Sequence, residues 1–97
     1  NGIRVQISHA EPFVEYVPIM VKTDDTVTLN SGSFTLIRGK VEMRISYNDM
    51  TESEFEQMDY HIYNKQIHQL KIHACGELTY TITFIELEES GNVNSSF

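Results

Sequence analysis

The chain has 97 residues, of which fourteen are acidic and seven basic, so its formal net charge is −7 with neutral histidines. This charge repels phosphate backbones, and the basic residues are scattered, which argues against direct binding to DNA or RNA. A chain of this length folds as one domain, and no composition break divides it. We expect a single globular domain over residues 1–89 and a flexible tail or the start of a linker over residues 90–97.

Two absences set the expected compartment. The sequence has no apolar run near the roughly 20 residues of a membrane-spanning helix, and no signal peptide opens it. Cys75 is the only cysteine, which excludes an internal disulfide. We therefore expect no membrane insertion, and a reducing compartment such as the cytoplasm of a cell or host. Asn1 rather than Met opens the chain, so targeting by a preceding segment is left open.

The first predicted elements are strands. Residues 3–8 alternate apolar and polar side chains, which is the period of a strand with one buried face. Residues 13–22 are rich in β-branched and aromatic residues. The two faces of this second run are Val17, Ile19 and Val21 on one side and Tyr16 and Met20 on the other. Pro18 has no N–H for a neighbouring strand, so this strand is expected at a sheet edge or at a bulge.

Successive turns then predict an antiparallel meander. Polar turns at residues 23–25 and 30–33 bring apolar residues opposite one another. The expected pairs are Val21 with Val27, Ile19 with Leu29, Leu29 with Phe34, and Val27 with Leu36.

Arg38-Gly39 is interpreted as a third, two-residue turn. It would pair Leu36 with Val41, and residues 41–47 would form the next alternating strand. The alternative is a bulge at Gly39 within one long strand.

After residue 48 the pattern predicts a helix. Thr51 and Glu54 have the spacing of a capping box, and Met50 and Phe55 stand at the positions of a hydrophobic staple. The helix is expected to begin at Glu52, and Thr51→Ala to cost about 1 kcal/mol of stability.

Residues 65–75 allow two interpretations. In one the helix continues to a cap at Gly76. In the favoured one it stops near Asn64, and residues 74–76 form a hairpin turn that pairs Ile72 with Leu78. The predicted fold class is α+β, an antiparallel β-meander of five to seven strands, sandwich- or barrel-like, with one helix inserted before the C-terminal strand or hairpin.

Few residues have the pattern of a chemical site. His61, His68, His73 and Cys75 lie near one another in the sequence, but their spacing is not that of a zinc site, so we expect solvated or cross-strand histidines, no metal and no cofactor. A Cys75–His pair lacks an orienting third residue. The acidic pairs have structural explanations in turns and in the predicted helix cap, so no catalytic residue is assigned and no enzyme is expected.

Surface residues remain as candidates for binding. The edge strand and the predicted helix leave five residues outside the core, and we expect these to contact a partner: Tyr16, Pro18, Met20, Tyr60 and Tyr63. Pro18 has a second explanation, since a proline also blocks aggregation at an edge.

The expected function is a non-enzymatic protein–protein interaction or assembly module that binds a protein partner or a second copy of itself. It would be either free-standing, as in many viral or phage structural and accessory proteins, or a domain of a larger chain. The alternative is an acidic inhibitor that mimics nucleic acid on a basic partner. A small enzyme using carboxylate and histidine residues ranks third.

Overall fold

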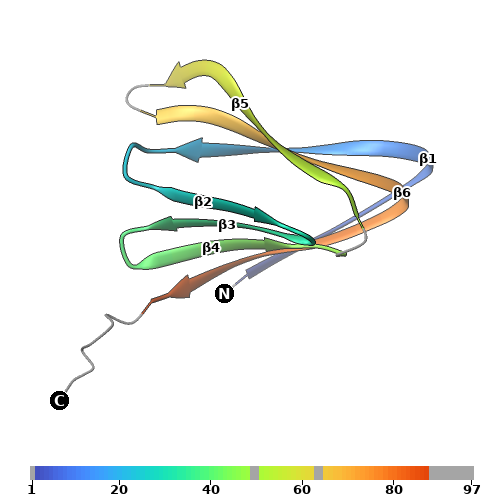
Figure 1. Ribbon diagram of the computed structural model, residues 1–97. Coiled ribbons are helices and arrows are strands. Elements are labelled where there is room, and N and C mark those ends of the chain that lie inside the picture. Colours follow the sequence, from blue (N-terminus) through green and yellow to red (C-terminus); the bar gives the residue numbers. More distant parts are fainter. Residues whose placement is uncertain (1, 49–50, 63–64, 88–97) are drawn as a thin grey trace.

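The structure is a computed structural model that describes residues 2–48, 51–62 and 65–87, with only the backbone course for residues 59–62 and 65 (Figure 1). All regular structure in the described residues is β-strand. The strands are β1 (Gly2–Val21), β2 (Thr26–Asn30), β3 (Ser33–Arg38), β4 (Val41–Ser46), β5 (Ser53–Ile62) and β6 (Lys65–Glu86).

The six strands form one antiparallel sheet that divides into two layers. The strand order is β1-β6-β4-β3-β2, and β5 also pairs with β6. Because β5 pairs with the first half of β6 and β4 with the second half, β6 passes from one layer to the other. The narrow layer is residues 12–21 of β1, residues 65–75 of β6, and β5. The wide layer is residues 2–8 of β1, residues 77–86 of β6, and β4, β3 and β2.

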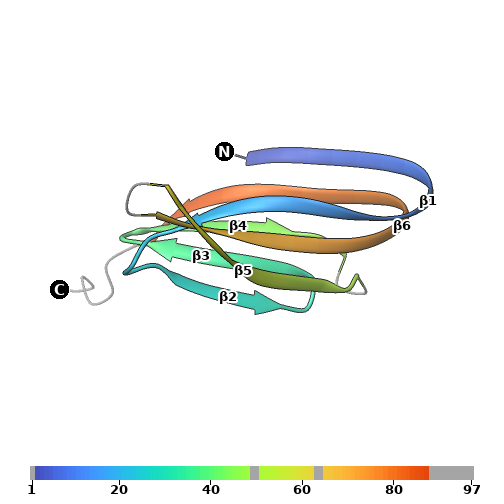
Figure 2. The same ribbon diagram turned by 90° about the horizontal axis from the view of Figure 1, so that it is seen from above.

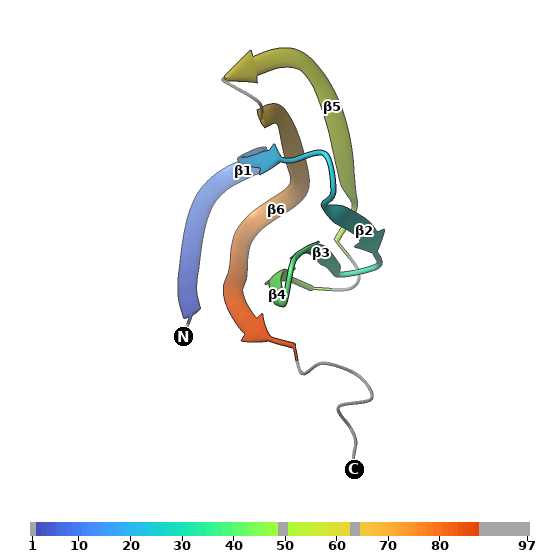
Figure 3. The same ribbon diagram turned by 90° about the vertical axis from the view of Figure 1, so that its left-hand side faces the viewer.

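The two long strands bend together between the layers, so the sheet curls into a half-barrel (Figure 3). At the bend the register of β1 against β6 shifts between Ser8 and Pro12, and residues 9–11 lie opposite Gly76. Gly76 has a φ of 87°, a left-handed conformation that side-chain-bearing residues seldom adopt. This bulge turns the sheet and lets both strands continue beyond it.

The core lies between the two layers. Along each strand every second side chain projects to the same face of the sheet, and in both layers this face points toward the other layer. Buried apolar residues come from both layers: Ile19, Leu70 and Ile72 from the narrow layer, and Phe34, Leu36, Ile45, Leu78 and Tyr80 from the wide layer. The predicted inner face of residues 13–22 is confirmed, since Ile19 is buried and Val17 and Val21 pack against the core.

The predicted helix is wrong, and with it the α+β class: the protein is all-β in the described residues. Instead of capping a helix, Thr51 precedes β5, and Glu54 lies within it. Tertiary contacts favour the strand, because Phe55 lies opposite Leu70 and its ring is 4.7 Å from that of Phe34. With no helix to cap, the expected cost of Thr51→Ala no longer follows. The staple residue Met50 is outside the described residues.

The predicted hairpin at residues 74–76 is also wrong, because β6 is a single strand of 22 residues. The hairpin is favoured by the alternation of Tyr80, Ile82 and Phe84, which predicts a strand that needs a neighbour. This strand has β1 on one side and, from residue 81 onward, β4 on the other.

The meander prediction is partly confirmed. Val27 lies opposite Leu36 and Leu29 opposite Phe34, as expected. The β3–β4 hairpin is present, but Gly39-Lys40 forms its turn, so Leu36 pairs with Met43 rather than with Val41. The predicted pairing of residues 19–21 with residues 27–29 is wrong. β1 ends in the narrow layer and β2 begins in the wide layer, so the connection at residues 22–25 joins two layers and makes no hairpin.

Candidate partner-binding groove

β1 is an edge strand. It pairs with β6 on one side, and no other described strand pairs with it. The edge predicted from Pro18 is therefore confirmed for residues 12–21. A free edge offers backbone donors and acceptors to a further strand.

The direction of these backbone groups follows from two observations. Arg38 donates a hydrogen bond from Nη2 to the carbonyl oxygen of Met20 at 3.0 Å, which places that carbonyl on the side of β1 away from β6. Backbone groups alternate in direction along an antiparallel strand, so Tyr16 and Pro18 point the same way. A proline without N–H fits an outward position.

A groove of about 340 Å³ runs beside this edge, between the narrow layer and the floor formed by the wide layer. Figure 2 shows, from above, the N-terminal half of β1 at the border of the sheet, beside the C-terminal half of β6. The lining is mainly apolar and includes Val17, Ile19, Met20, Leu36, Met43 and Phe84.

Parts of the groove floor are exposed although they belong to the core face of the wide layer. Phe84 is 48 % and Val41 44 % exposed. Ile3 is 57 % exposed and lies opposite Ile82, so it continues the same face toward the end of β1. The narrow layer has fewer strands than the wide layer and leaves these side chains uncovered. Apolar side chains grouped in this way mark interaction sites more often than single exposed ones do.

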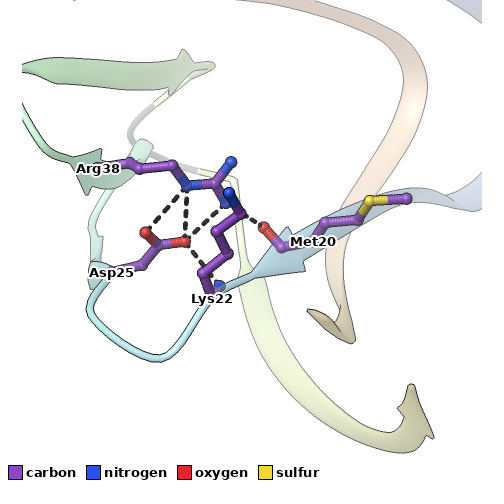
Figure 4. A network of polar contacts seen from close by, with 4 residues as sticks. All are labelled: Met20, Lys22, Asp25 and Arg38. Carbon is purple, nitrogen blue, oxygen red and sulfur yellow. Dashed lines mark hydrogen bonds and ion pairs between the residues drawn. The ribbon is translucent and has the colours of Figure 1, made fainter. Parts of the chain in front are cut away.

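A polar network closes one end of the groove (Figure 4). The carboxylate of Asp25 accepts hydrogen bonds from Arg38 Nε at 3.0 Å and from Arg38 Nη2 at 2.7 Å. It also accepts the backbone N–H of Lys22 at 2.8 Å. Because Arg38 also binds the carbonyl of Met20, the network ties the end of β1 to β3. The Arg38 hydrogen bond holds the pKa of Asp25 below its ordinary value, and Asp25 in turn raises the pKa of Arg38.

A second polar contact joins the layers farther inside. The hydroxyl of Tyr80 on β6 donates a hydrogen bond to Glu15 Oε2 on β1 at 2.8 Å. Burial raises the pKa of Tyr80 to about 12, and the hydrogen bond to the nearby carboxylate adds to that shift. The part of β1 beside the groove is therefore held at both ends, at Glu15 and at Met20.

The structure brings three of the five predicted partner residues to the groove edge. Tyr16 and Met20 are exposed on the outer face of β1, and Pro18 lies between them. Tyr60 lies in β5, but its side chain is not described, and Tyr63 is outside the described residues. The sequence interpretation missed Phe84, Val41 and Arg38. Val41 and Phe84 stand in alternating strands that were assigned to the core, and Arg38 was assigned to a turn. No local pattern indicates that the covering layer stops short of Val41 and Phe84.

The other candidate chemical residues do not form a site in the described part of the chain. It contains no group of three or more histidine, cysteine or acidic side chains arranged to hold a metal ion. His68 is buried and stacks on Phe55, with ring centroids 5.0 Å apart. His73 Nε2 lies 3.4 Å from Glu54 Oε2, a cross-strand contact of the kind expected. Cys75 is exposed at the bend. His61 lies in β5, and its side chain is not described.

Acidic side chains follow alternate positions at the start of β5, at Glu52 just before the strand and at Glu54 and Glu56 within it. Lys71 on the neighbouring strand lies 3.2 Å from Glu56 and 3.8 Å from Glu54. The hydrogen bond to Glu56 raises the pKa of Lys71, so the lysine stays charged and neutralises part of the row. A hollow of about 520 Å³ beside β5 is mainly polar and open.

Comparisons with protein-family models, with curated proteins and with solved structures find no match to this chain. In the ranges that the structure describes, no helix has the length and hydropathy needed to cross a membrane.

Proposed function

We propose that the protein is a non-enzymatic interaction module that binds a partner protein in the groove beside the free edge of β1. The observation that carries this proposal is the group of exposed side chains on the core face of the wide layer, Ile3, Val41 and Phe84. Burying a large apolar side chain away from water is favourable by about 1.5–3 kcal/mol when the burial is complete. A partner that covers the floor gains this free energy.

The neighbouring edge supports the same location. A partner that covers Phe84 also reaches the outward backbone groups of Tyr16 and Pro18, which supply polar contacts around an apolar centre. Interfaces commonly combine an apolar core with a polar rim in this way. A reducing compartment suits a protein with one exposed thiol, Cys75, which would be open to oxidation elsewhere.

The acidic-inhibitor alternative has less support. It needs a continuous row of carboxylates, and the row on β5 has Lys71 beside two of its members. Such an inhibitor would lose affinity steeply with salt, whereas an apolar groove contact would not. The salt dependence of partner binding separates the two functions.

The proposal is tested with two neighbouring residues of β6. Phe84→Ser changes the groove floor, and Ile85→Ser is the matched control, because Ile85 is 38 % exposed and points to the opposite face of the sheet. Proteins that bind the wild type are identified by affinity capture and quantitative mass spectrometry. A specific partner should be lost with Phe84→Ser and retained with Ile85→Ser. Equal capture by both variants contradicts the proposal.

A further inference from the structure

The free edge of β1 presents an incomplete set of backbone hydrogen-bonding groups. Tyr16 offers both N–H and C=O to the outside, since its direction follows that of Met20. Pro18 offers only C=O, because proline has no N–H. Met20 offers its N–H, whereas its carbonyl already accepts a hydrogen bond from the charged guanidinium of Arg38 and is a poorer acceptor for a second donor. A strand that pairs here has to match this set.

We infer that the groove binds an extended segment of the partner, added antiparallel to β1, in which a proline faces Met20 and apolar residues face Ile19 and Val17. This inference rests on the proposed function and specifies the form of its partner. All strand pairs in the described fold are antiparallel, and antiparallel pairing is slightly more stable per residue than parallel pairing.

The positions of the apolar residues follow from strand geometry. Directly opposed residues on antiparallel strands project to the same face of the sheet. Val17 and Ile19 project toward the core, and both line the groove. The two partner residues opposite them therefore project into the groove, above the exposed floor at Phe84. Apolar side chains at these two positions cover the floor.

The position of the proline follows from Arg38. A partner residue opposite Met20 would point its N–H at a carbonyl that already has a donor. An ordinary residue there points its N–H at this poorer acceptor, whereas a proline has no N–H to satisfy. From its N-terminus, the partner segment therefore has the pattern proline, apolar, any residue, apolar, any residue. The last of these exchanges two hydrogen bonds with Tyr16.

A second copy of this chain is a poorer occupant. If two β1 edges paired about a two-fold axis at Val17, Tyr16 would face Pro18 of the second copy, and Val14 would face Met20. The pair with Pro18 has one ladder bond for either occupant, but Val14 points an N–H at the Met20 carbonyl, which already accepts a hydrogen bond from Arg38, whereas a proline has no N–H there. The net charge of −7 on each copy adds repulsion and favours a partner segment with basic residues.

The probe is the synthetic peptide Lys-Pro-Ile-Thr-Ile-Thr-Lys, titrated into the full chain and followed by amide NMR. Its second Thr faces Tyr16. N-methylation of that residue removes one ladder bond and should weaken binding by about 3- to 10-fold. Replacing the proline by alanine should weaken binding to the wild type by about 3- to 10-fold, because the alanine N–H points at the Met20 carbonyl, which already accepts a hydrogen bond from Arg38. In Arg38→Met the Met20 carbonyl is free, so the alanine peptide should bind about 3- to 10-fold more tightly than the proline peptide.

The outcomes separate the two proposals. If N-methylation has no effect, or if the alanine peptide binds the wild type at least as tightly as the proline peptide, the strand register is wrong. If the peptide does not bind but partner capture depends on Phe84, the partner docks as a folded surface: strand addition is overturned and the groove function stands. A dimer that depends on Phe84 in sedimentation also overturns strand addition by a partner. If capture does not depend on Phe84, both proposals fail.

Discussion

Asp25→Asn tests whether the network at the end of the groove holds β1 in place. The carboxylate accepts three hydrogen bonds from Arg38 and one from the backbone of Lys22, at distances of 2.7–3.1 Å. An asparagine keeps one oxygen acceptor but turns an amide toward the guanidinium. The Asp25 side chain is 2 % exposed, which favours a large effect, whereas Arg38 is 42 % exposed, so solvent screens the pair. An effect between that of an exposed and that of a buried ion pair follows, and we expect Asp25→Asn to lower the free energy of unfolding by about 1–2 kcal/mol.

The assay is thermal unfolding of Asp25→Asn beside Asp24→Asn, an exposed neighbour with the same change of charge. In a domain of this size the expected loss lowers the melting temperature by about 5–15 °C. Because the pKa of Asp25 is lowered in the folded state, the difference from the wild type should be full above about pH 4 and should disappear as the pH falls through the lowered value. Equal melting temperatures for the two variants at neutral pH would refute this reasoning.

Three further predictions concern the core, the bend and the buried tyrosine. Leu70→Ala should cost about 2–5 kcal/mol in denaturant unfolding, because Leu70 is fully buried, and a cost below that of Ile85→Ala contradicts its place in the core. Gly76→Ala should cost about 1–2 kcal/mol, since its φ is 87°, and an unchanged midpoint argues against the bulge. Tyr80→Phe should be less stable than the wild type, and this difference should be full below about pH 10 and disappear as the pH rises toward about 12. An ultraviolet titration that finds every tyrosine near its ordinary pKa contradicts this prediction.

Local turns could be predicted from the sequence because their partners are close along the chain. The β2–β3 register follows from the polar turn at residues 30–33 and the alternating apolar residues around it. The edge position of β1 is one of the two alternatives, an edge or a bulge, that Pro18 indicates, because proline cannot give an N–H to a second neighbour. The inner face of residues 13–22 follows from period-two alternation.

The pairing of β1 with β6 could not be predicted in the same way. Val5 pairs with Tyr80, and the sequence between them contains the other four strands. Gly76 has the positive φ of a turn residue, but β6 continues past it and pairs with β1 on both sides, so Gly76 lies at a bulge. Thr51 and Glu54 have the spacing of a helix cap, yet Phe55 gains more by packing between Leu70 and Phe34 than a helix would provide.

The groove was missed for a related reason. Phe84 and Val41 alternate like core residues, and they do project to the core face. Whether such residues are covered depends on the number of strands in the opposing layer, which is set by long-range pairing. Tyr16 and Met20 were identified because Pro18, which lies between them in the sequence, indicates an edge strand.

Hydrogen exchange of the free and partner-bound protein tests the central claim most directly. If the partner binds along the free edge, the amides of Tyr16 and Met20 should exchange more slowly in the complex, because both point away from β6 toward the partner. Residues 53–57 of β5, on the other side of the narrow layer, should be unchanged. Slower exchange in β5 with no change at residues 14–20 of β1 would contradict the account.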